Sequence, residues 1–275
     1  MPTATPALNG SYYHRAARSS AVGDVGDVGD VYAATDLTRS HWGDNLQHGS
    51  PPLALLTREV ERCIEGTGQR IARLSLDILG AIPVAAVRVE ARVARPGRRI
   101  CLVEAEMYAG DDERPVARLS AWALAIDDTT AAAADRHPPL AALPALPPPD
   151  WFAQASGYAK SVVWKVQPDA PDGASIAWLS PTVHLVDAEP TTALQRLAMV
   201  VDSANGVGAV LDPQSYMFMN TDTVVHLHRL PSGDDFGLRA RASIGPDGVG
   251  VTTAELFDHT GFIGTSAQAL LVQRR

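Results

Sequence analysis

The chain has 275 residues and a mass of 29.1 kDa, which suits one large domain or two of about 130 residues. Hydrophobic residues make up 46% and charged residues 20%, values that exclude a chain disordered or membrane-embedded as a whole. The net charge of −8 disfavours a nucleic acid as the main partner, because phosphate binding needs a net basic face.

The cysteines and the N-terminal sequence indicate the cellular compartment. Cys63 and Cys101 show neither a metal-ligand spacing nor a disulfide framework, which indicates a reducing environment. The N-terminal residues lack an apolar core of signal-peptide length, and no stretch is apolar for long enough to span a bilayer. We therefore predict a cytoplasmic protein without a membrane span.

The first elements are a repeat and a helix. A Gly-Asp-Val triplet recurs between Val22 and Val31, and we interpret it as a low-complexity loop before a strand. It lacks the ligand pattern and closing glutamate of a calcium loop, so we assign it no function. A helix is predicted from Leu53 to Ile64, after Ser50-Pro51-Pro52, because proline suits a first helical turn and the apolar residues recur on one face.

The two halves of the chain repeat one pattern. Three strands separated by two turns are predicted between Arg92 and Ala125, and again between Arg241 and Val272. A second helix is predicted from Thr191 to Ser203, before the second set of strands. Each half therefore shows one helix followed by an antiparallel meander.

A proline-rich segment separates these halves and defines the predicted domains. An alanine run and a series of prolines between Asp127 and Asp150 can neither continue a helix nor enter a central strand. We predict an N-terminal hotdog domain at 1–127, a linker at 128–150 and a C-terminal hotdog domain at 151–275. The fold class is α+β, a double hotdog in which each curved antiparallel sheet wraps one long helix and the two sheets pair edge to edge.

Three polar residues of the second half are the candidate catalytic residues. Asp202 lies near the end of a predicted helix, where the macrodipole disfavours a carboxylate and tends to raise its pKa, as suits a general base. Gln268 is an amide on an otherwise apolar strand, at the place where the first meander carries Trp122, and is costly to bury without partners. The amide of Asn220 could orient a water between Asp202 and Gln268.

Each of these residues also has a plainer interpretation. Asp202 would be an exposed residue of a helix-ending turn, Asn220 a strand-end cap, and Gln268 a solvent-facing residue of an alternating strand. His226 and His228 share one face of a strand, but a zinc site needs a third ligand, and none is apparent. Nucleophile-elbow and dinucleotide motifs are missing as well, so we predict no metal and no cofactor.

Three stretches resemble the double-hotdog acyl-CoA thioesterase family, which includes bacterial acyl-CoA thioesterase II and actinobacterial thioesterase-like proteins. The first, Gln47 to Pro52, is similar to the family's His-Gly-Gly segment, with Ser50 replacing the second glycine. The second, Leu194 to Gly206, contains Asp202 at the place of the family's catalytic aspartate. The resemblance extends from Trp42 to Val272.

The third stretch joins Asn220 to Gln268, which match the family's hydroxyl residue and glutamine, Asn220 standing where Ser or Thr is usual. The resemblance implies hydrolysis of a fatty acyl-CoA to free acid and CoA by a water that Asp202, Asn220 and Gln268 hold and activate. It implies a homo-oligomer of double-hotdog units, an apolar acyl channel and helix-start N–H groups at the thioester carbonyl. The residues placed near the thioester are His48, Gly49 and Ser50.

Two other functions stay open on this fold, since a fold does not settle function. A hotdog protein in lipid or polyketide metabolism could bind acyl thioesters without hydrolysing them, and the Ser50 and Asn220 departures favour this reading. An enoyl-CoA hydratase would need an Asp-His pair. Asp202 has no histidine near it in sequence, and His48 could approach it only if the two halves pair.

Overall fold

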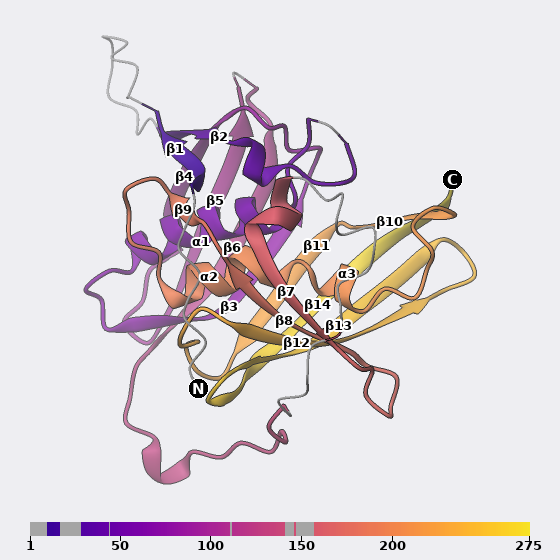
Figure 1. Ribbon diagram of the computed structural model, residues 1–275. Coiled ribbons are helices and arrows are strands. Elements are labelled where there is room, and N and C mark those ends of the chain that lie inside the picture. Colours follow the sequence, from indigo (N-terminus) through magenta and orange to yellow (C-terminus); the bar gives the residue numbers. More distant parts are fainter. Residues whose placement is uncertain (1–9, 17–28, 44, 111, 141–145, 147–156) are drawn as a thin grey trace.

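The computed structural model describes residues 10–16, 29–43, 45–110, 112–140, 146 and 157–275. Their strands form one 14-stranded sheet, in the order β7-β8-β12-β13-β14-β11-β3-β6-β5-β4-β2-β1-β9, with β10 paired to β14 beside this path (Figure 1). The strands of the first half are β1 (Ser11–Arg15), β2 (Asp30–Ala34), β3 (Gln69–Ile78), β4 (Ala86–Arg95), β5 (Ile100–Ala109) and β6 (Pro115–Ala125). Those of the second are β7 (Val162–Gln167), β8 (Ser175–Pro181), β9 (His184–Val186), β10 (Tyr216–Asn220), β11 (Asp222–Leu227), β12 (Phe236–Ile244), β13 (Val249–Asp258) and β14 (Gly261–Arg274).

One helix per half packs inside this sheet. The helix α1 (Ser50–Cys63) contacts β4, β5 and β6, and it also packs along α2 (Ala193–Val201) (Figure 1). Its apolar stripe, which includes Leu53, Leu56 and Val60, is fully buried. The helix begins at Ser50, three residues before the predicted start. Short 3-10 turns flank these elements: η1 (Asp36–Thr38), η2 (Thr130–Ala132) and η4 (Gly157–Ser161).

The second helix is shorter than predicted. It begins with a capping box, in which the Thr192 hydroxyl accepts from the Gln195 N–H and the Gln195 side chain accepts from the Thr192 N–H. It ends at Val201, Asp202 is its C-cap, and a separate turn of helix, α3 (Ala204–Val207), follows. The prediction that Asp202 lies at the end of a helix is confirmed.

The two predicted meanders and their pairing are confirmed, and they define a double hotdog. The first meander is β4-β5-β6 and the second is β12-β13-β14, all antiparallel. The half-sheets join edge to edge where β11 pairs antiparallel with β3, with Val224 opposite Ser75. This junction places the helix of one half beside the helix of the other.

The predicted alignment of Trp122 with Gln268 is wrong. Trp122 lies between the buried Ala121 and Ala123 on β6 and is only half-buried, so strand alternation turns it to the outer face. Gln268 points to the inner face of β14 and is 1% exposed. The two side chains therefore stand on opposite faces of their sheets.

A strand of the second half completes the edge of the first, a feature that the sequence pattern did not predict. The short strand β9 pairs parallel with β1, with Ser11 opposite His184 and Tyr13 opposite Val186. The N-terminal strand thus lies between β2 and a strand from the other half. The predicted domain boundaries stay a prediction, and most of the Gly-Asp-Val repeat and the end of the linker lie outside the described residues.

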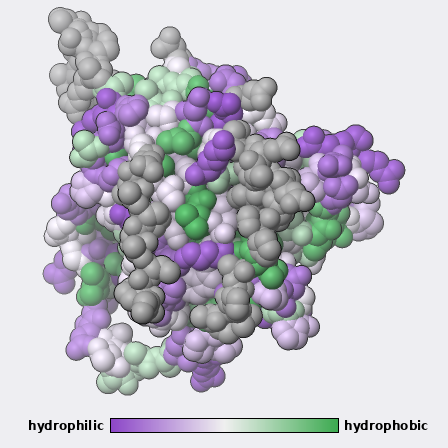
Figure 2. Space-filling view, in the orientation of Figure 1, coloured by the Kyte–Doolittle hydropathy of each residue, from purple (hydrophilic) through white to green (hydrophobic). Residues whose placement is uncertain are grey.

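Over the coloured part of the face shown, hydrophilic and hydrophobic residues are interspersed (Figure 2). Within the described ranges, no helix is both long enough and apolar enough to cross a membrane.

Candidate active site

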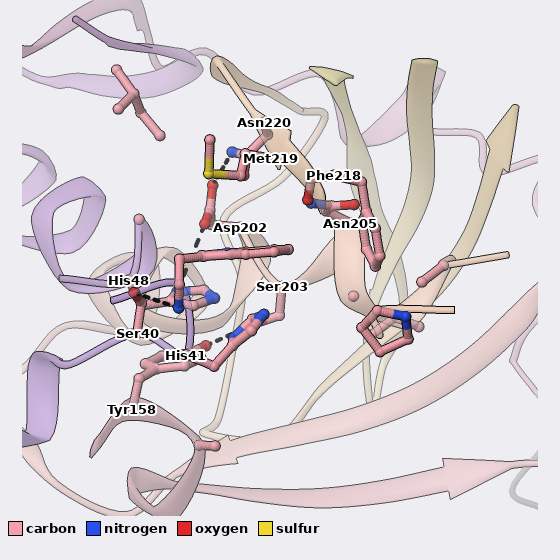
Figure 3. Close-up of a pocket in the computed structure, with 18 of the residues that line it drawn as sticks. Ser40, His41, His48, Tyr158, Asp202, Ser203, Asn205, Phe218, Met219 and Asn220 are labelled. Carbon is pink, nitrogen blue, oxygen red and sulfur yellow. Dashed lines mark hydrogen bonds and ion pairs between the residues drawn. The ribbon is translucent and has the colours of Figure 1, made fainter. Parts of the chain in front are cut away.

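A cavity of about 890 Å³ lies between the two halves, a size typical of small-molecule sites. His48 and Gly49, which precede α1, line it from the first half, and Asp202 and Asn220 line it from the second. Figure 3 shows His48, Asp202 and Asn220 converging on one side of it. Much of the remaining wall is apolar or aromatic, formed by Trp42, Leu46, Ile78, Ile82, Tyr158, Trp164, Val166, Ile176, Leu211, Phe218 and Leu271.

Asp202 is the buried carboxylate of this cavity, 4% exposed. Three donors reach its Oδ1 atom: Asn220 Nδ2 at 2.7 Å, Thr223 Oγ1 at 2.6 Å and Gln268 Nε2 at 3.2 Å. These donors come from β10, β11 and β14, three neighbouring strands, so the sheet itself fixes their spacing. One carboxylate oxygen is therefore fully engaged by the protein.

The donors around Oδ1 are also hydrogen-bonded to one another. The Thr223 hydroxyl has a single proton, which it gives to Asp202, so its lone pairs accept from Gln268 Nε2 at 3.0 Å and Asn220 Nδ2 at 3.2 Å. Gln268 Nε2 also lies 3.0 Å from the backbone oxygen of Asp202. Amides and hydroxyl together hold the carboxylate in one orientation.

The second carboxylate oxygen, Oδ2, lies against Gly49. A Cβ atom built on Gly49 would come 2.5 Å from Asp202 Oδ2, a distance that no side chain can occupy. A glycine here lets the backbone of the first half approach the carboxylate of the second. Within the described part of the chain, Oδ2 accepts no hydrogen bond, so it is the oxygen available to a bound water or substrate.

His48 is a neutral imidazole in this arrangement. Burial lowers its pKa from 6.5 to about 3, and its Nδ1 accepts from the Ser50 N–H at 3.1 Å, which leaves the proton on Nε2. Nδ1 lies 3.7 Å from Asp202 Oδ2, too far for a hydrogen bond. The pairing of the halves does bring His48 beside Asp202, but not as an ion pair.

Burial raises the pKa of Asp202 above its ordinary value of 3.8, while the hydrogen bonds from Thr223, Asn220 and Gln268 oppose the rise. The predicted direction is correct, although the dominant cause is desolvation and not the helix macrodipole. A carboxylate with a raised pKa is a better proton acceptor than an exposed aspartate.

The start of α1 offers fewer N–H groups than a usual helix. The Ser50 N–H is used by His48, Pro51 and Pro52 have none, and the Leu53 N–H donates to the Gly49 oxygen. Among the described residues, the Gly49 N–H has no acceptor. It is thus the unpaired donor of this helix start, on a residue that lines the cavity.

Tyr158 and Thr223 belong to the site but were missed from the sequence. Tyr158 stacks on His48 with ring centroids 3.8 Å apart, and its hydroxyl lies 2.7 Å from Ser203 Oγ and 3.0 Å from the Met199 oxygen. Thr223 supplies a hydroxyl to the same carboxylate oxygen that Asn220 reaches, and the match of Asn220 to the family's hydroxyl residue stays a prediction. Asn220 donates to Asp202 Oδ1 beside that hydroxyl.

The fold and the buried carboxylate at a helix end define a double-hotdog enzyme. Family models match both halves: the acyl-CoA thioesterase N-terminal domain over residues 38–124, and the acyl-CoA thioesterase C-terminal domain over residues 133–272. The chain belongs to the acyl-CoA thioesterase family, and it is a thioester hydrolase that acts on acyl thioesters.

Solved structures agree with this fold. A hotdog-fold protein of unknown function from Alicyclobacillus acidocaldarius is 14% identical, covering 91% of this chain and 95% of that one, with a TM-score of 0.66. An acyl-CoA thioesterase II from Mycobacterium marinum is 11% identical, covering 87% and 96%, with a TM-score of 0.63. At such identities the likeness concerns the fold alone. No curated protein matches the sequence.

Proposed function

We propose that the protein hydrolyses a fatty acyl-CoA to free acid and CoA by a water that Asp202 activates. The observation that carries the proposal is the unequal use of the two Asp202 oxygens. Three side chains donate to Oδ1, whereas Oδ2, which lies beside Gly49, accepts no hydrogen bond from the described residues, and Asp202 lines the cavity. An oriented carboxylate with one free oxygen in a substrate cavity is the arrangement that a general base needs.

The chemical step follows from this geometry. Asp202 Oδ2 takes a proton from water as the water oxygen bonds to the thioester carbonyl carbon. The tetrahedral intermediate then expels the sulfur, the C–S bond breaks, and the proton passes from Asp202 to the thiolate. The products are a carboxylic acid and the CoA thiol. The raised pKa of Asp202 suits both its acceptance and its return of the proton.

The first half stabilises the charge that develops on the carbonyl oxygen. The Gly49 N–H is a donor at the start of α1, where the helix macrodipole also favours negative charge. Because its approach to Asp202 is so close, a carbonyl held by this N–H lies within reach of a water on Oδ2. His48 and Ser50 support this geometry through the bond between Nδ1 and the Ser50 N–H.

The cavity supports an apolar acyl group. Its wall is largely aliphatic and aromatic, and Trp42 packs edge-on against Phe218 with centroids 5.7 Å apart. Burial of methylene groups against such a wall gives about 0.8 kcal/mol each. A fatty acyl chain gains more from this wall than a short polar acyl group does.

Release of CoA thiol from acyl-CoAs of increasing chain length tests the proposal. Wild-type protein is compared with Asp202→Asn, which keeps the Oδ1 hydrogen bonds but removes the base. We expect turnover by the wild type and a loss of about 10²- to 10⁴-fold in kcat for the variant.

The matched control is Asp77→Asn, which removes an exposed carboxylate of β3 that does not line the cavity. It is expected to keep wild-type turnover. Equal turnover by Asp202→Asn and the wild type would refute Asp202 as the base. Binding of acyl-CoA with no turnover by the wild type would leave a non-hydrolytic binding protein.

A further inference from the structure

Two buried polar atoms on paired strands have no hydrogen-bond partner among the described residues. They are Thr252 Oγ1 on β13 and Gln268 Oε1 on β14. The two residues stand directly opposite each other in the antiparallel register, and they are 0% and 1% exposed. A buried donor or acceptor without a partner destabilises a fold, so two such groups side by side call for an explanation.

The two atoms are chemically complementary. A threonine hydroxyl can rotate to donate, and a glutamine amide oxygen can only accept. Side chains of directly opposed residues have Cβ atoms about 4.5–5.5 Å apart, a separation that one hydrogen bond, direct or through one water, can span. Rotation of Thr252 about its Cα–Cβ bond would let its hydroxyl donate toward the Gln268 oxygen without moving the backbone.

The other end of the Gln268 amide is already committed. Its Nε2 faces the Asp202 backbone oxygen at 3.0 Å, Asp202 Oδ1 at 3.2 Å and Thr223 Oγ1 at 3.0 Å. An inverted amide would bring Oε1 against the two Asp202 oxygens, which can only accept. The amide therefore has one productive orientation, and a donor on the β13 side would enforce it.

We propose that Thr252 is a positioning residue for thioester hydrolysis, whose hydroxyl donates to Gln268 Oε1 and holds Nε2 toward Asp202. The inference rests on the proposed function, since it assigns Thr252 to the same carboxylate. Thr252 does not line the cavity and does not touch substrate. Its effect is exerted through Gln268 alone.

Ser266 is the natural comparison. Its Oγ is also buried without a described partner, on the same inner face of β14. Ser266 stands two residues before Gln268 along the strand, about 7 Å away, whereas Thr252 is directly across the ladder. Cross-strand position favours Thr252 as the donor.

The pH behaviour of Asp202 gives a readout that a purely structural role would not change. The titratable groups facing this carboxylate are His48 before α1, Tyr158 on η4 and Asp222 on β11. Burial lowers the pKa of His48 to about 3 and raises that of Tyr158, so neither titrates near neutrality. Because Asp202 is the proposed base, the acid limb of the rate profile follows the ionisation of its carboxylate.

The test measures kcat, KM and the pH profile for wild type, Thr252→Val, Thr252→Ser and Ser266→Ala. Valine keeps the shape of threonine without its hydroxyl, and serine keeps the hydroxyl. We expect Thr252→Val to lose about tenfold in kcat with unchanged KM, a loss worth about 1.4 kcal/mol in the barrier. Its acid limb should move to higher pH, because a hydrogen bond that lowers the pKa of Asp202 is weakened.

Thr252→Ser is expected to recover the wild-type profile, and Ser266→Ala to match it. Thr57→Val makes the same exchange at a buried helix position whose hydroxyl bonds the Leu53 oxygen, and it reports the general cost of losing such a hydroxyl. Wild-type kcat and acid limb in Thr252→Val would overturn the inference. So would equal losses in Thr252→Val and Thr252→Ser, which would assign the effect to packing.

A second readout does not require turnover. In protein labelled with nitrogen-15, the side-chain amide signals of Gln268 are those missing from Gln268→Glu. Their exchange with solvent should accelerate in Thr252→Val and not in Thr252→Ser. No acceleration would refute the positioning role. Wild-type protein without turnover, but with this acceleration, would refute the hydrolase and keep the Thr252 contact.

Discussion

The two meanders share one architecture but differ on the inner face of their last strand. In β6, the inward residues Leu119, Ala121 and Ala123 are all apolar and buried. In β14, the inward residues include Ser266 and Gln268, both polar and equally buried. The first face only packs against a helix, whereas the second also binds a carboxylate.

The difference shows a division of roles between the halves. The second half contributes side chains: a carboxylate at a helix end and three donors from neighbouring strands. The first half contributes backbone, because Gly49 lies so close to the carboxylate that a Cβ atom built on it would come 2.5 Å from Asp202 Oδ2. Neither half holds a complete site, so each half can be altered separately to test its role.

Among the changes that compare the two halves, the largest effect is expected when the close approach of Gly49 to Asp202 is blocked. Gly49→Ala places a methyl group 2.5 Å from Asp202 Oδ2, so either the carboxylate or the start of α1 must move. We expect about a 10³-fold loss of kcat/KM in the CoA thiol assay, because the base is displaced. Gly206→Ala serves as control, since a Cβ there meets nothing within 4 Å. Near wild-type activity of Gly49→Ala would contradict the close approach.

A second change makes the face of β14 apolar like that of β6. Gln268→Leu removes the hydrogen bond that Gln268 Nε2 donates to Asp202 Oδ1 and the one that it donates to Thr223 Oγ1. We expect kcat to fall about 10²-fold while the protein stays folded. Gln273→Leu, an exposed glutamine of the same strand, should leave kcat unchanged. Full activity in Gln268→Leu would show that the amide is not part of the site.

The reverse change makes the face of β6 polar. Leu119→Gln buries an amide where the described neighbours are apolar, and we expect a loss of about 2 kcal/mol in the free energy of unfolding. Thermal unfolding should show a Tm lower by about 4–8 °C. Leu119→Met, which conserves volume, should cost less. An unchanged Tm for Leu119→Gln would mean that the two faces tolerate polarity equally.

The smallest expected effect is the gain in stability when the buried carboxylate of Asp202 is replaced by a neutral amide. The folded-state pKa of Asp202 is raised above 3.8, so its ionisation opposes folding once the pH exceeds that value. Asp202→Asn should therefore raise the Tm by about 2–4 °C at pH 7, equivalent to about 1 kcal/mol. The gain should vanish as the pH falls toward 3.8. A gain that is constant with pH would exclude ionisation as its cause.

Much of this arrangement could be predicted from the sequence. The repeated helix and meander gave the double hotdog, and Asp202 and Gln268 were found because each is unusual where it stands. Thr223 was missed because a β-branched residue is ordinary in a strand. Strand alternation offered a signal, since Thr223 shares its inward face with Val225 and Leu227 and is the polar member of that set.

Other features could not be predicted from local patterns. Tyr158 follows a proline-rich segment without periodicity, and its stack on His48 depends on tertiary contacts alone. The distance between Gly49 and Asp202 depends on how β3 and β11 join, which residue spacing does not encode. Trp122 and Gln268 do not correspond because side chains alternate along a strand, so a shift of one residue in the alignment places a side chain on the opposite face.

The two halves pair their strands at two places in the sheet. One is the junction of β11 with β3, and the other, distant from it in the strand order, is the parallel pairing of β9 with β1. A chain cut between η2 and η4 would yield two fragments that each lack an edge partner, and exposed strand edges favour aggregation. Produced together, the fragments should assemble and recover thiol release. The molecule can thus serve as a complementation pair, in which restored catalysis reports that two fragments have met.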